Sequence, residues 1–112
     1  TTNLTFYGAL KNICEYLLTN YSNKTNLLVT PFKRHSQNNP NQYGYYLDDY
    51  VKAVKEVGAK YGLPVFDFFE NMGGTPFNTA WKQSNLPDGT HPNQSYYYTV
   101  ANKLINFINE QI

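Results

Sequence analysis

Apolar residues recur every three or four positions in three stretches of the chain, and each stretch predicts an amphipathic helix. The first runs from about Thr5 to Tyr21, the second from Tyr46 to Tyr61, and the third from Tyr97 to the C-terminus. Gly62 follows the second stretch, where a glycine is typical of a helix C-cap. Pro92 precedes the third stretch and is expected at its first helical position.

Two short apolar runs separate these helices, Leu27–Val29 and Pro64–Phe68. Uninterrupted apolar runs fit strands that are covered on both faces, as in parallel sheets. The strand–helix–strand order predicts a parallel α/β architecture, with loops at Phe32–Tyr43 and Asn71–Pro87. Two strands make a poor sheet, so we expect residues 1–112 to be one part of a single domain whose other strands come from elsewhere.

Composition narrows the functional classes. The net charge of +1 gives no electrostatic argument for nucleic acid or an anionic membrane, and no apolar run approaches the roughly 20 residues that span a bilayer. The single cysteine, Cys14, excludes an intramolecular disulfide and a multi-cysteine metal site. We therefore expect no metal and no cofactor. Frequent asparagine and tyrosine with sparse charge suit neutral, hydroxyl-rich ligands such as glycans, although an AT-rich genome would give the same composition.

The run Asp-Gly-Thr-His-Pro-Asn begins at Asp88, between a predicted loop and the last helix. A carboxylate three residues before a histidine, across a glycine-containing turn, can curl back onto the imidazole. Asp88 would then accept a hydrogen bond from Nδ1–H of His91 and fix the ring tautomer, which leaves Nε2 free to face a nucleophile. The alternative is a helix-capping turn with a structural Asp–His hydrogen bond.

This segment closely resembles the final block of the SGNH (GDSL-type) hydrolases. Thr5–Leu10, followed by a helix and Leu28–Pro31, resembles the stretch after the family's Asn block, and Val65–Asp67 resembles its last strand. The resemblance covers the chain as the C-terminal portion of the family's domain. It departs from the family in having no Gly-Asp-Ser and no Gly-x-Asn-Asp.

The resemblance implies a three-layer α/β/α fold with a parallel, flavodoxin-like sheet, and ester hydrolysis by a Ser-His-Asp triad. Asp88 and His91 would be the catalytic residues. An N-terminal segment or companion chain would complete the sheet and carry the serine nucleophile. An O-acetyl or other acyl ester on a carbohydrate is the expected substrate, and a secreted, cell-surface or virion-associated protein is favoured over a cytoplasmic one. The rival interpretation is a non-catalytic glycan-binding or virion/cell-surface structural module with this fold.

Five further residues are candidates for substrate binding. Lys33, Arg34 and His35 follow the end of a strand, where parallel α/β folds place their sites, but a solvated loop is the alternative. Phe77 and Trp81 precede the Asp-His turn, and their rings would either stack on sugar faces or pack the loop onto the domain. Cys14 lies on the apolar face of the first helix, which favours a buried structural thiol over a nucleophile.

Overall fold

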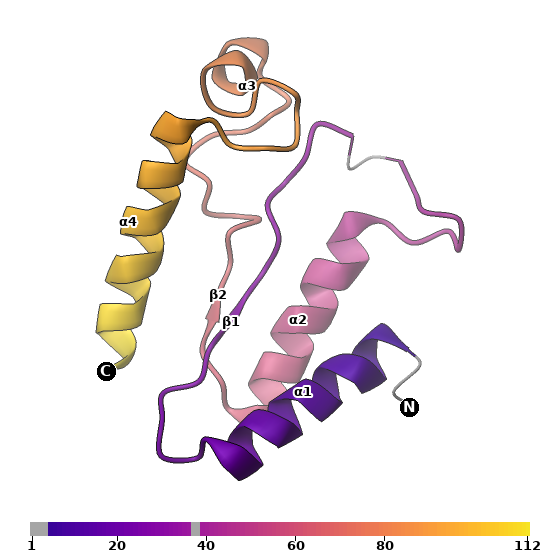
Figure 1. The fold of residues 1–112 in the computed structure, drawn as a ribbon. Coiled ribbons are helices and arrows are strands. Elements are labelled where there is room, and N and C mark those ends of the chain that lie inside the picture. The colour runs from indigo at the N-terminus through magenta and orange to yellow at the C-terminus, as the bar shows by residue number, and fades with distance from the viewer. Residues whose placement is uncertain (1–4, 37–38) are drawn as a thin grey trace.

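The computed structural model describes residues 5–36 and 39–112 and shows a mixed α/β fold (Figure 1). Its elements in chain order are α1 (Phe6–Asn20), β1 (Leu28–Val29), α2 (Leu47–Tyr61), β2 (Val65–Phe66), α3 (Thr79–Asn85) and α4 (Gln94–Gln111). Residues 37 and 38 fall in the expected loop over 32–43 and, like residues 1–4, lie outside the described part of the chain.

The two strands are parallel, as the strand–helix–strand order predicts. Leu28 pairs with Val65 and Val29 with Phe66. Backbone hydrogen bonds flank this register, because the Leu28 N–H donates to the Pro64 carbonyl at 2.9 Å and the Thr30 N–H donates to the Phe66 carbonyl at 3.0 Å. Within the described residues the sheet contains these two strands, and its outer edges carry no further strand.

Helices lie on both sides of the strands (Figure 1). α2 contacts β1 and β2 and also packs against α1, whereas α4 lies on the opposite side of the strands. There the ring of Phe107 in α4 lies 5.0 Å from the ring of Phe66 in β2. Of the helices in the described ranges, none is long and apolar enough to cross a membrane.

Capping residues set the ends of the helices. The Thr5 side chain accepts a hydrogen bond from the Gly8 N–H at 2.9 Å at the start of α1. Gly62 ends α2 in the left-handed conformation with φ of 67°, which confirms the predicted C-cap. The expectation for Pro92 is wrong. Asn93 is the N-cap of α4 and its side chain accepts from the Tyr96 N–H, so the proline lies one residue before the cap.

The segment predicted as a loop over 71–87 contains the short helix α3. Its seven residues include one large apolar side chain, Trp81, so they show no helical periodicity. The local signal is Asn78, whose side-chain oxygen accepts from the Trp81 N–H at 2.9 Å and caps the first turn.

Candidate functional site

The turn after α3 brings Asp88 and His91 together. Nδ1 of His91 lies 2.6 Å from Oδ2 of Asp88. The other carboxylate oxygen, Oδ1, accepts hydrogen bonds from the backbone N–H groups of Thr90 at 2.8 Å and His91 at 2.7 Å. The backbone of the turn therefore holds the carboxylate, and the carboxylate in turn orients the imidazole.

Gly89 makes this turn possible. Its φ of 84° lies in the left-handed region, which disfavours residues with a Cβ. A Cβ at this position would also lie 2.8 Å from the Cβ of His35. The Gly89 carbonyl accepts a hydrogen bond from the His35 N–H at 2.9 Å, so the loop that follows β1 lies directly against the turn.

The turn is attached to the domain through Asn93 and an apolar cluster. The Asn93 side-chain amide donates to the Ser84 carbonyl at 2.7 Å, and its backbone N–H donates to the Asn85 carbonyl at 2.9 Å, which joins the start of α4 to α3. A buried cluster packs together next to this junction, formed by Met72, Leu86 and Tyr96.

The environment of the pair keeps Asp88 ionised. Hydrogen bonds from the His91 N–H, from the His91 ring and from the Thr90 N–H hold the pKa of the Asp88 carboxyl far below its ordinary value. A carboxylate that accepts from Nδ1–H fixes one tautomer of the imidazole and leaves Nε2 as the acceptor. Nε2 makes no hydrogen bond within residues 5–36 and 39–112, and 75% of the His91 side chain is exposed. The free nitrogen is therefore accessible to a hydroxyl group supplied from elsewhere.

Of the residues predicted to bind substrate after β1, the structure brings His35 to the Asp-His turn through its bond to Gly89. Arg34 instead lines a cavity of about 340 Å³ together with Tyr45 and Tyr50. The ammonium group of Lys33 lies 4.7 Å from the centre of the Phe69 ring. This cation–π contact directs the Lys33 side chain towards Phe69.

The two aromatic candidates differ in their surroundings. The Trp81 ring lies 5.3 Å from the Tyr96 ring in an edge-to-face arrangement, and its indole abuts Gly74 so closely that a Cβ there would collide with it. Trp81 thus packs the loop onto the domain. Phe77 is 47% exposed, which leaves its ring available at the surface.

Two other groups, Cys14 and Asp67, have structural roles. Cys14 is fully buried, and burial raises the pKa of its thiol, which disfavours the thiolate that a nucleophile needs. Burial opposes ionisation of Asp67, but hydrogen bonds from Lys55 and from the Glu70 N–H lower the pKa of its carboxyl. In the described part of the chain, no group of three or more His, Cys, Asp or Glu side chains is placed to hold a metal ion.

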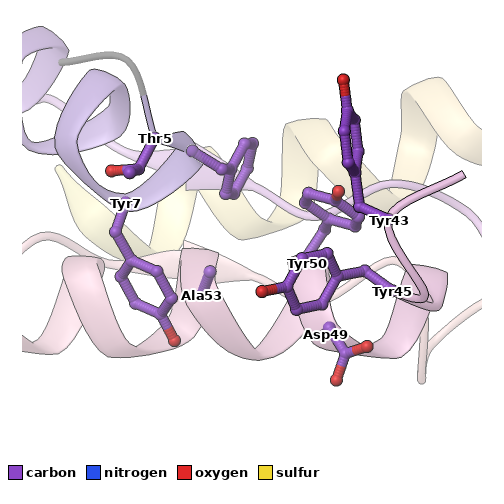
Figure 2. A pocket seen from close by; sticks show the side chains of 8 residues that line it. Thr5, Tyr7, Tyr43, Tyr45, Asp49, Tyr50 and Ala53 are labelled. Atoms are coloured by element: carbon purple, nitrogen blue, oxygen red, sulfur yellow. The ribbon is translucent and has the colours of Figure 1, made fainter. Parts of the chain in front are cut away.

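Sequence reasoning missed a second hollow in the surface, between the N-terminal ends of α1 and α2. Its volume is about 580 Å³ and tyrosine side chains form much of its wall (Figure 2). The start of α1 and the stretch from Tyr43 to Ala53 build it, and because these are far apart in the chain no single local motif marks it. The frequent use of tyrosine, 11 residues in 112, is the one signal in the sequence.

The fold and the turn define a mixed α/β protein with parallel strands and an exposed, backbone-held Asp–His pair. The chain is similar to a crystal structure of a Lactobacillus plantarum protein, a Northeast Structural Genomics consortium target, with a TM-score of 0.86 and 28% identity over 96% of this chain and 55% of that chain. A second crystal structure matches with a TM-score of 0.81 and 26% identity over 88% of this chain and 49% of that one. The chain thus spans about half the length of these structures. No protein-family model and no curated protein matches it.

Proposed function

We propose that Asp88 and His91 form the acid–base pair of an SGNH-type serine ester hydrolase. The observation that carries this proposal is the 2.6 Å contact between Nδ1 of His91 and a carboxylate that two backbone N–H groups hold in place. A capping turn needs no free, solvent-facing Nε2, whereas a general base does.

In the proposed reaction, Nε2 of His91 accepts the proton of a serine hydroxyl while the serine oxygen attacks the ester carbonyl. The tetrahedral intermediate collapses, the imidazolium returns the proton to the departing alcohol, and an acyl-serine remains. Water then attacks the acyl group by the same proton transfers and releases the acid. Asp88 stays ionised throughout and stabilises the imidazolium.

The serine and the oxyanion hole would come from outside residues 1–112, within a three-layer α/β/α domain. Two observations support a domain completed by further chain. The outer edge of β1 is unpaired within the described residues, with Val29 40% exposed, and the matching crystal structures are about twice as long as the region they share with this chain.

An acyl ester on a carbohydrate is the substrate we propose. The chain carries a net charge of only +1, so its surface gives no general attraction for an anionic substrate.

Hydrolysis of p-nitrophenyl acetate by the full-length protein tests the catalytic assignment. His91→Ala removes the general base, and kcat should fall by about 10²–10⁴-fold with KM little changed. Asp88→Asn keeps the imidazole but frees its tautomer, so its loss should be no larger than that of His91→Ala. Both variants should keep the far-ultraviolet circular dichroism of the unmodified protein, because both residues lie on an exposed turn.

Asp48→Asn is the matched control, because it removes an exposed carboxylate in the first turn of α2, away from the turn. Its kcat should equal that of the unmodified protein. Labelling by a fluorophosphonate, which reacts only with an activated serine, should disappear with His91→Ala. A folded His91→Ala protein with unchanged kcat would contradict the proposal and favour the capping interpretation.

A further inference from the structure

The cavity between α1, α2 and the loop over 41–45 has the size and lining of a small-molecule site. Its volume of about 580 Å³ falls within the range of roughly 300–1,000 Å³ that is usual for ligand pockets. Four of its lining residues are tyrosines, and Phe6 adds a fifth ring. Figure 2 shows Tyr45 reaching from the loop towards Tyr50 of α2, while Tyr43 projects from the loop.

The aromatic walls are held in place by one amide side chain. Oδ1 of Asn41 accepts hydrogen bonds from the backbone N–H groups of Tyr43 at 2.9 Å and Tyr45 at 3.0 Å. Its Nδ2 donates to the Tyr50 hydroxyl at 2.7 Å. Asn41 thus holds the loop and the Tyr50 ring together. This reduces the conformational entropy that the protein would lose when a ligand binds.

Contacts between aromatic rings also hold the walls of the cavity together. The rings of Phe6 and Tyr50 meet edge to face at 5.0 Å, and those of Tyr45 and Tyr50 at 6.3 Å. Tyr7 closes the far side, where its hydroxyl donates to Glu56 at 2.5 Å. The hollow is therefore bounded by rings that are already oriented.

The lining disfavours an anionic ligand. Among the described residues that line the cavity there is no lysine, arginine or histidine, so an anion would find no counter-charge from them. Its one carboxylate, Asp49, accepts a hydrogen bond from the Tyr46 N–H at 2.8 Å. The hydroxyls of Tyr43 and Tyr45 make no hydrogen bond within residues 5–36 and 39–112. Aromatic faces with hydroxyl groups at their edges match a ligand that has apolar C–H faces and many hydroxyls.

We infer that this cavity binds a neutral saccharide, with a sugar ring stacked on Tyr43 or Tyr45. The site is distinct from the Asp88–His91 turn and holds the ligand without reacting with it. The inference does not depend on the proposed hydrolase, because it is tested by affinity and not by turnover. A protein without esterase activity would still show the binding, and a working esterase could lack it.

Titration of the full-length protein with neutral trisaccharides tests the inference. Maltotriose, cellotriose, mannotriose and N,N′,N″-triacetylchitotriose are the probes, and saturation-transfer NMR with calorimetry gives the dissociation constant. At least one should bind saturably. Tyr43→Ala and Tyr45→Ala should each weaken that binding about 2–10-fold, the value of an aromatic contact. Asn41→Ala should weaken it while every ring remains present.

Tyr98→Ala is the matched control, since this tyrosine is 65% exposed on α4 and lies outside the cavity lining. Its affinity should be unchanged. The inference is overturned if none of the four trisaccharides binds at millimolar concentration. It is also overturned if Tyr98→Ala weakens binding as much as Tyr45→Ala, or if only a neutral apolar dye such as Nile red occupies the site.

Discussion

α2 and α4 are both long amphipathic helices that flank the same pair of strands, yet they are covered to different extents. In α2, five of 15 residues are buried, namely Val51, Ala53, Val54, Val57 and Gly58. In α4, Tyr96 is the one buried residue among 18, and Tyr97 and Ile105 are more than half exposed. Other residues of the described chain bury one face of α2, whereas α4 is buried mainly at its first turn.

This difference separates two roles of the same sequence pattern. An apolar stripe that neighbouring residues cover builds the core, while a stripe that stays exposed indicates a contact surface. The exposed positions on α4 therefore support the proposal that further chain completes the domain. Three measurements test whether α2 and α4 differ in this way.

The largest expected effect is at the anchor of α4. Met72 is 2% exposed and packs with Leu86 and Tyr96, so Met72→Ala should lower the free energy of unfolding by about 2–5 kcal/mol. Ile105→Ala, on the exposed face of the same helix, should change it by less than about 0.5 kcal/mol in the chain of residues 1–112. Urea denaturation measures both. Equal losses would mean that α4 is held along its whole length.

The next effect is at the closest approach of α2 to the sheet. A Cβ on Gly58 would lie 2.3 Å from Cγ2 of Val65, so Gly58→Ala should cost about 1–3 kcal/mol through overpacking. Val65→Ala removes the clashing methyl group, and the double variant should therefore lose less stability than the two single changes added together. Strict additivity in a double-mutant cycle would show that the two residues do not touch.

The smallest effect is at Tyr96, the buried residue of α4. Its hydroxyl donates to the Met72 carbonyl at 2.7 Å, and Tyr96→Phe should cost about 0.5–1.5 kcal/mol at neutral pH. Burial raises the pKa of this hydroxyl from 10.0 to about 12, so the folded state favours the proton. The resulting stabilisation is present below pH 10 and is lost as the pH rises towards about 12.

Thermal unfolding at several pH values checks this linkage. Between pH 10 and 12 the unmodified protein should lose stability more steeply than Tyr96→Phe, which has no hydroxyl to titrate at this position. Parallel curves would indicate that the pKa of the Tyr96 hydroxyl is the same in the folded and the unfolded protein.

Periodicity in the sequence located the three long helices and both strands, because each pattern reports burial on one face or on two. It failed for α3, whose single large apolar residue gives no period. The start of α4 was also misplaced, because Pro92 was expected at the first helical position and Asn93 is instead the N-cap before Gln94. Along α4 periodicity chose Tyr97 for the apolar face, whereas Tyr96 is the tyrosine that is buried. One residue of error turns a helix by about 100°, so the choice between adjacent tyrosines depends on tertiary packing.

The two candidate sites also differ in how far the sequence predicts them. The Asp–His contact follows from local spacing, since three residues and a glycine suffice to bring the groups together. The tyrosine cavity requires α1, α2 and the intervening loop to be placed relative to one another, and no local pattern encodes that placement.

The hydrogen bond from the His35 N–H to the Gly89 carbonyl can be used to measure how often the Asp-His turn opens. That amide hydrogen can exchange with deuterium only when the two loops separate, so its protection factor would report the free energy of local opening. If it exchanges far faster than the amides of α2, the turn opens independently of the rest of the domain. The orientation of His91 would then last only as long as each closed interval.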